Sequence, residues 1–294
     1  MRAMRQVTGR VAVLLLGAAA VFGCAGSAAS NGSPRAPVAG VGGEEEDATA
    51  GLVEHHRHHH HGGVTLLIAM SLDTLGVSPE QKAAVEKIRR DLHARMEPAR
   101  AAEQSLLVTL ADGLAGGAID SAKVDAAVGQ LSSAAAGVND ASTDALNQLH
   151  AVLTPPQRVA LVDKLEAHWS VWQKANTEES DHLAQLTVEL GLAPDQVDRI
   201  RVSLPEGMKV VPRFDAQEVS AHIQAFCDAF KAPTFDAKTL TTGGAATAHM
   251  VGWAGAHMAR FIESVGPALT PDQRAKFAQL LRQHASHNPS ADGG

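Results

Sequence analysis

The chain has 294 residues, and its 25 basic and 32 acidic side chains give a formal net charge of −7. A net acidic protein is a poor candidate for sequence-independent nucleic-acid binding, which depends on neutralising phosphates. Aromatic residues make up 3% of the chain, which argues against a β-sandwich or barrel because strands are enriched in them. Ala supplies much of the apolar content and has the best helix propensity, so the composition favours an all-α fold.

Residues 1–23 are predicted to be a signal peptide. Arg2, Arg5 and Arg10 precede an apolar stretch, residues 11–23, that is too short to span a membrane. The stretch ends at Cys24, which small residues follow, and the whole segment resembles a bacterial lipoprotein signal in which this cysteine becomes the lipid-bearing first residue. Plain secretion, with cleavage at a nearby Ala or Ser, is the alternative. Both predict export to the cell envelope, and the lipoprotein signal predicts a periplasmic protein anchored to a membrane.

Residues 24–63 are predicted to form a flexible linker with a His-rich tract. Ser, Gly, Ala and Pro dominate its first half and an acidic run occupies residues 44–47, without apolar periodicity. Imidazole is the commonest protein ligand for Zn²⁺, Ni²⁺ and Cu²⁺, so the tract is a candidate metal site. Its histidines are His55, His56, His58, His59, His60 and His61. A solvated low-complexity tract with incidental metal affinity is the alternative.

From Val64 onward the apolar pattern is helical. Val85, Ile88, Leu92 and Met96 recur at spacings of three and four, which is the signature of an amphipathic helix. Only residues 208–214 suggest a short extended segment.

A motif for helix initiation occurs four times. Ser or Thr caps the helix, Pro follows at its first position, and Gln three residues after the cap reaches back to the cap's N–H. The first and third copies lie 115 residues apart, and the second and fourth 116, so the chain divides into units 64–175 and 176–290. The motif residues are Ser78, Gln81, Leu153, Thr154, Gln157, Leu192, Gln196, Leu269, Thr270 and Gln273. Ala193 lacks the cap hydroxyl, so its helix is expected to begin less firmly, by about 1 kcal/mol.

With these motifs the sequence resembles the Spy/CpxP family of periplasmic proteins, which carry Leu-Thr-x-x-Gln motifs. The resemblance implies an all-helical fold and antiparallel dimers shaped like a shallow cradle. The family includes ATP-independent chaperones, an inhibitor of an envelope-stress sensor kinase, and zinc- and nickel/cobalt-responsive proteins. Because the unit occurs twice here, we expect two tandem repeats that pair as an intrachain pseudo-dimer.

The resemblance implies a protein that binds unfolded or misfolded envelope proteins without ATP. The candidate client-binding residues are Trp169 and Trp172, on one apolar stripe, and Arg89 and Arg90, in the locally basic stretch 82–100. Core packing is the first interpretation of the two Trp residues, and client binding is the one that the resemblance implies. The alternative function is a metal-binding (Zn, Ni or Cu) sensor or resistance protein that regulates an envelope-stress response, with a sensor kinase as partner. A structural tether is the third.

The remaining candidate residues predict structural roles. Cys227 lies on or beside an apolar stripe and is expected to be buried, with an intermolecular disulfide or a metal ligand as alternatives. His249, Trp253 and His257 share one helix face, but the rise of a helix separates the two histidines by about 12 Å, too far to chelate one ion. We therefore expect a packed face there. No common hydrolase or phosphate-binding motif occurs, so neither an enzyme nor a required cofactor is expected.

Overall fold

The computed structural model describes residues 63–175, 180–211, 216–240 and 243–286. Within these ranges the chain forms helices and no strand, which confirms the predicted all-α fold. The helices are α3 (Gly63–Thr74), α4 (Pro79–Arg95), α5 (Glu97–Gly116), α6 (Ser121–Gly137), α7 (Asn139–Val152), α8 (Pro155–Ala175), α9 (Ser180–Leu190), α10 (Pro194–Met208), α11 (Ala216–Lys231), η2 (Ala237–Thr239), α12 (Gly243–Val265), η3 (Gly266–Ala268) and α13 (Pro271–Ser286). The predicted signal peptide, Cys24 and the His tract lie outside the described residues.

The capping motif begins four of these helices, as predicted. Each helix starts at the proline that follows the cap: Pro79, Pro155, Pro194 and Pro271. At α4 the Gln81 backbone N–H donates to Ser78 Oγ over 3.3 Å, and the Ser78 backbone N–H donates to Gln81 Oε1 over 3.0 Å. This reciprocal arrangement satisfies two of the N–H groups that a helix start leaves without partners.

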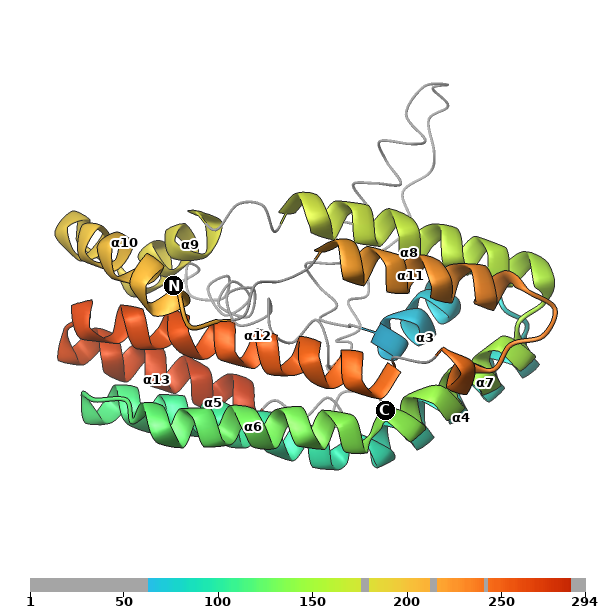
Figure 1. Cartoon of the computed structure of the whole chain (residues 1–294), viewed down its shortest axis with the longest axis horizontal. Coiled ribbons are helices and arrows are strands. Elements are labelled where there is room, and N and C mark those ends of the chain that lie inside the picture. Colours follow the sequence, from blue (N-terminus) through green and yellow to red (C-terminus); the bar gives the residue numbers. More distant parts are fainter. Residues whose placement is uncertain (1–62, 176–179, 212–215, 241–242, 287–294) are drawn as a thin grey trace, which may run out of the picture.

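The long helices pair across the chain (Figure 1). Helices α5, α6, α12 and α13 lie side by side, and α8 with α11 forms a second pair above one end of them. The contacts α5–α13, α6–α12 and α8–α11 each join a helix from residues 63–175 to one from residues 180–286. Helices α3, α4 and α7 occupy the end beneath α8, and α9 with α10 occupies the opposite end.

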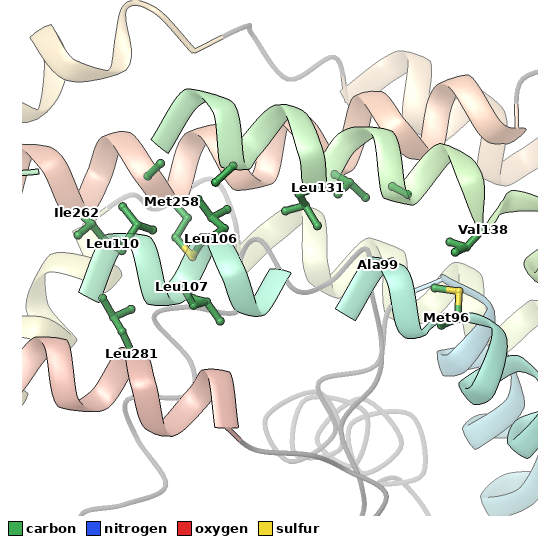
Figure 2. Close-up of a cluster of buried hydrophobic side chains, with 14 of the residues drawn as sticks. Met96, Ala99, Leu106, Leu107, Leu110, Leu131, Val138, Met258, Ile262 and Leu281 are labelled. Carbon is green, nitrogen blue, oxygen red and sulfur yellow. The ribbon is translucent and has the colours of Figure 1, made fainter. Parts of the chain in front are cut away.

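The core between these pairs is aliphatic. Leu106 and Leu110 of α5 point toward Met258 and Ile262 of α12, while residues of α13 close the other side of α5 (Figure 2). At Gly255 of α12 a Cβ would meet Cδ2 of two leucines, on α5 and α6, at 3.2–3.4 Å. The missing side chain therefore lets α12 approach both helices closely.

The expected extended segment at 208–214 is wrong where the structure describes it. Met208 ends α10, which continues through Pro205, and residues 209–211 form turns. The N–H groups of Lys209 and Val211 donate to carbonyls three residues back, over 3.3 and 3.1 Å. These local bonds satisfy amides for which the described residues offer no neighbouring strand. Of the helices that the structure describes, none combines the length and apolar character needed to cross a bilayer.

Candidate functional site

The motif glutamines join two helix starts. Gln81 Nε2 donates to Gln157 Oε1 over 2.8 Å and to the Val152 carbonyl over 2.9 Å. Gln157 Nε2 lies 3.2 Å from Gln81 Oε1. Gln157 Oε1 also accepts from the Thr154 backbone N–H over 3.0 Å. One amide therefore caps its own helix and ties α4 to α8.

The second pair of glutamines repeats this arrangement. Gln196 Nε2 donates to Gln273 Oε1 over 2.7 Å and to the Ala268 carbonyl over 2.7 Å. Gln273 Nε2 lies 3.1 Å from Gln196 Oε1 and 3.3 Å from the Gly191 carbonyl. The Thr270 backbone N–H donates to Gln273 Oε1 over 2.9 Å. These bonds tie α10 to α13.

The motif leucines anchor the helix entries. Leu153, Leu192 and Leu269 are all buried immediately before their caps. An apolar residue in that position fixes the angle at which the chain enters a helix. At Ala193 only the backbone N–H bond to Gln196 Oε1 is present, over 2.9 Å, so this start lacks the hydroxyl half of the cap. In the described residues the motif positions thus have structural roles.

Local acids neutralise much of the basic stretch on α4. Arg89 lies 2.9 Å from the half-buried Glu86, and Lys87 lies 2.5 Å from Asp91 in an exposed pair. Arg90 is exposed without an ion pair among the described residues. Neighbouring opposite charges cancel the field that would attract an acidic segment over a distance. Client binding by Arg89 and Arg90 therefore stays a prediction, on a helix whose positive field is partly cancelled.

Trp169 contributes to the contact between α8 and α11. Its side chain is half-buried, and its Nε1 donates to Ser220 Oγ of α11 over 3.1 Å. A bonded indole N–H is usual where a Trp ring is packed inside a protein. Trp172 lies on α8, but its side chain lies outside what the structure describes.

The described ranges hold no metal site. No three His, Cys, Asp or Glu side chains within them are arranged to hold an ion. Cys227 is buried as predicted, and burial followed by the nearby Glu166 charge raises its pKa to about 12. The thiolate is the metal-binding form, so this cysteine is a poor ligand. Trp253 packs against His257 with ring centres 5.2 Å apart, and His249 is exposed.

The sequence patterns did not predict the burial of two groups of ionisable side chains. Glu103 lies half-buried on the apolar stripe of α5, and burial raises its pKa to about 7. His150 and Arg158 meet under an aromatic cluster beside α11. One feature of the sequence could have drawn attention to Arg158: an Arg directly follows the motif Gln at both 157–158 and 273–274.

Residues 47–160 match the family model of heavy-metal resistance proteins. That family is related to the Spy/CpxP-like helical proteins, so the match supports the resemblance at this coarser level. The matched segment includes the His tract and continues through α3 to the start of α8. No curated protein and no solved structure is detectably similar to the chain.

Proposed function

We propose that the protein is a heavy-metal resistance protein of the cell envelope that binds metal ions through its His tract. The family match carries this proposal, because the matched segment begins before the tract and extends into the helical body. An ordinary imidazole, with a pKa of about 6.5, is mostly neutral at pH 7, and the six within residues 55–61 suit borderline divalent cations. We therefore propose Zn²⁺, Ni²⁺ or Cu²⁺ as the cargo, bound without catalysis.

The N-terminal segment supports a location at a membrane surface for this function. Cleavage before Cys24 and acylation of its thiol would anchor the chain to a membrane, and residues 25–63 would link the anchor to the helices. The tract would then lie between membrane and helical body.

Calorimetric titration of the mature chain with Zn²⁺, Ni²⁺ and Cu²⁺ tests the proposal. We expect binding at micromolar concentration, weakening as acid protonates the ligands. Replacing the six tract histidines with Asn should abolish it, whereas His249→Asn on the exposed face of α12 should not. Metal tolerance of cells carrying either variant should follow the same order. Absence of heat, or equal binding by both variants, would refute the proposal.

We further propose that residues 64–175 and 176–290 are tandem repeats paired within one chain. Shifting the first segment by 116 residues places α5 on α11 and α8 on α13. The contact α5–α13 then corresponds to α11–α8, and α4–α7 corresponds to α10–α12. The two glutamine pairs correspond in the same way. Such an exchange of helices between halves is expected of a dimer joined into one chain.

A chaperone for unfolded or misfolded envelope proteins is the second candidate. The paired glutamine motifs favour it, since the resemblance to a family with chaperone members rests on them. Light scattering of a denatured client with and without the protein tests this function. Deletion of residues 54–61 should leave chaperone activity intact but remove metal binding, so the two functions are separable. A sensor kinase would be the partner if the protein signals metal load.

A further inference from the structure

A buried polar contact closes one end of the molecule. His150 Nε2 at the end of α7 lies 2.9 Å from the Ala232 carbonyl, which follows α11. Arg158 Nη1 of α8 lies 3.3 Å from His150 Nδ1, also contacts Nε2, and donates to the same carbonyl over 3.1 Å. Both side chains are 7% exposed. The contact therefore ties the end of α11 to α7 and α8.

Aromatic rings surround the imidazole. Phe235 stacks on His150 with ring centres 5.1 Å apart, and Phe230 meets it edge-on at 5.2 Å. No carboxylate pairs with Arg158 in the part of the chain described, and its Nε has no hydrogen-bond partner there. The site consequently holds one uncompensated positive charge in an apolar environment, where a second one would be costly.

At the opposite end of the molecule, the position that corresponds to His150 has no imidazole. The residue 116 positions after His150 is Gly266, where a Cβ would meet Leu114 at 3.2 Å and Ile119 at 3.8 Å. These two residues precede Phe230 and Phe235 by the same 116 positions. At this end, aliphatic side chains packed around a glycine therefore form the contact that the aromatic rings and His150 form at the other end. At these two matched positions of the described chain, an imidazole lies beside a guanidinium at one end and a glycine occupies the other.

Protonation of the ring opposes the contact. Arg158 Nη1 lies nearer to Nε2 than to Nδ1, so a neutral ring can accept from the guanidinium through its unprotonated nitrogen. A protonated ring has no acceptor nitrogen, so it would present N–H to the guanidinium N–H and add a second positive charge. Burial, together with the Arg158 charge, accordingly lowers the pKa of His150 from 6.5, although the bond to Ala232 opposes this.

Other charged groups around the ring are engaged elsewhere. On α11, Lys231 lies 3.8 Å from both Asp163 and Glu166 of α8. Beside η2, Asp236 Oδ1 accepts from the Asn147 side chain over 3.2 Å, and Lys238 lies 3.8 Å from Asp144. On α4, two acids pair with bases of the same helix and Arg95 pairs with Asp144 of α7, while on α3 Asp73 is exposed. On α6 and α12, the charged pair Asp125–Arg260 is remote from this end, near the start of α6.

We propose that His150 and Arg158 form an acid-sensitive clasp, and that protonation of His150 releases the α11–η2 junction from α7 and α8 while the opposite end stays closed. The folded pKa lies below the unfolded one, so the clasp is fully stable above the unfolded value and weakens as pH falls through the folded value. This device is independent of metal binding, because it uses none of the tract histidines.

Amide hydrogen exchange of the full chain at about pH 7.5 and about pH 5, corrected for intrinsic rates, tests the clasp. We expect protection of α11 to fall about tenfold or more in acid, while the end of α5, which packs at the opposite junction, keeps its protection. His150→Gln cannot titrate and should show no such loss. Equal acid loss in wild type and variant, or equal loosening at both ends, would overturn the proposal.

A titration of the native protein keeps the test valid if the variant fails to fold. The ring of His150, followed by NMR in the full chain, should titrate below about 6.5. Line broadening of α11 signals should accompany that titration. A pKa at or above the ordinary value, or α11 signals unchanged through the titration, would overturn the clasp.

Discussion

Gln157 engages three groups with a single amide. Its Oε1 accepts from the backbone N–H and from the hydroxyl of Thr154, both over 3.0 Å, while its Nε2 faces Gln81 at 3.2 Å. Truncating this side chain would leave part-buried polar groups without partners. Such groups cost more free energy than the bonds themselves contribute.

We expect Gln157→Ala to lower the free energy of unfolding by about 1–3 kcal/mol. Urea denaturation of the two proteins measures the difference. Gln130→Ala is the matched control, because Gln130 is exposed on α6 and makes no hydrogen bond among the described residues. Its effect should stay within about 0.5 kcal/mol. Similar losses for both variants would contradict a special role for the paired amides.

Glu103 makes stability depend on pH in the opposite direction to His150. Its folded pKa of about 7 exceeds the ordinary 4.5, so its contribution is complete below 4.5 and is lost as pH rises through 7. Glu103→Gln removes the cost of ionisation. The variant should be more stable than wild type by about 1–3 kcal/mol near pH 8 and equally stable near pH 4. A pH-independent difference in thermal denaturation would show that desolvation of this carboxylate is not the cause.

At the scale of helices, the sequence predicted best those features that depend on interactions between residues close together in the chain. The starts of α4, α8, α10 and α13 share the predicted proline and a Gln three residues after the cap position, whose Oε1 accepts from the cap backbone N–H. The Gln–Gln hydrogen bonds could not be predicted from the sequence. Their partners lie 76 and 77 residues apart, and only tertiary packing brings them together. His150 was missed for the same reason, since its aromatic surroundings come from a distant helix.

Two helix glycines should respond oppositely to substitution by alanine. A Cβ on Gly113 of α5 would lie 3.0 Å from backbone Cα and side-chain Cγ1 of Ile119, whereas on Gly129 of α6 it would meet nothing within 4 Å. Gly129→Ala should therefore stabilise the protein by about 0.5–1 kcal/mol through helix propensity. Gly113→Ala should destabilise it by about 1–2 kcal/mol through overpacking. Thermal denaturation compares them, and two shifts of the same sign would contradict the close packing at Gly113.

At the scale of the whole molecule, the two ends differ in chemistry. The α5–α13 contact is rich in leucine and carries an ion pair between Asp112 and Arg282 over 2.7 Å. The end with α8 and α11 instead gathers three phenylalanines, Cys227 and the His150 ring of α7. Surface ion pairs contribute about 0–1 kcal/mol, so apolar packing dominates both contacts. We infer that the ends can loosen under different conditions.

If the two halves pair within one chain, the protein should sediment as a monomer. Equilibrium sedimentation of the chain without its first 24 residues should give one mass at every concentration tested. Separate chains of residues 63–175 should self-associate or aggregate, because their α5 and α8 would have lost their partners α13 and α11. A predominantly dimeric full chain would indicate that the halves pair between molecules instead.

Joining these helices in one polypeptide makes their association unimolecular. A dimer of separate subunits dissociates on dilution, whereas tethered halves keep a fixed effective concentration set by the link between them. The assembled body also carries one N-terminus, and hence one Cys24 and one His tract, where two separate subunits would carry two. Each such body would therefore have a single point of attachment and a single metal-binding segment, at any copy number in the cell.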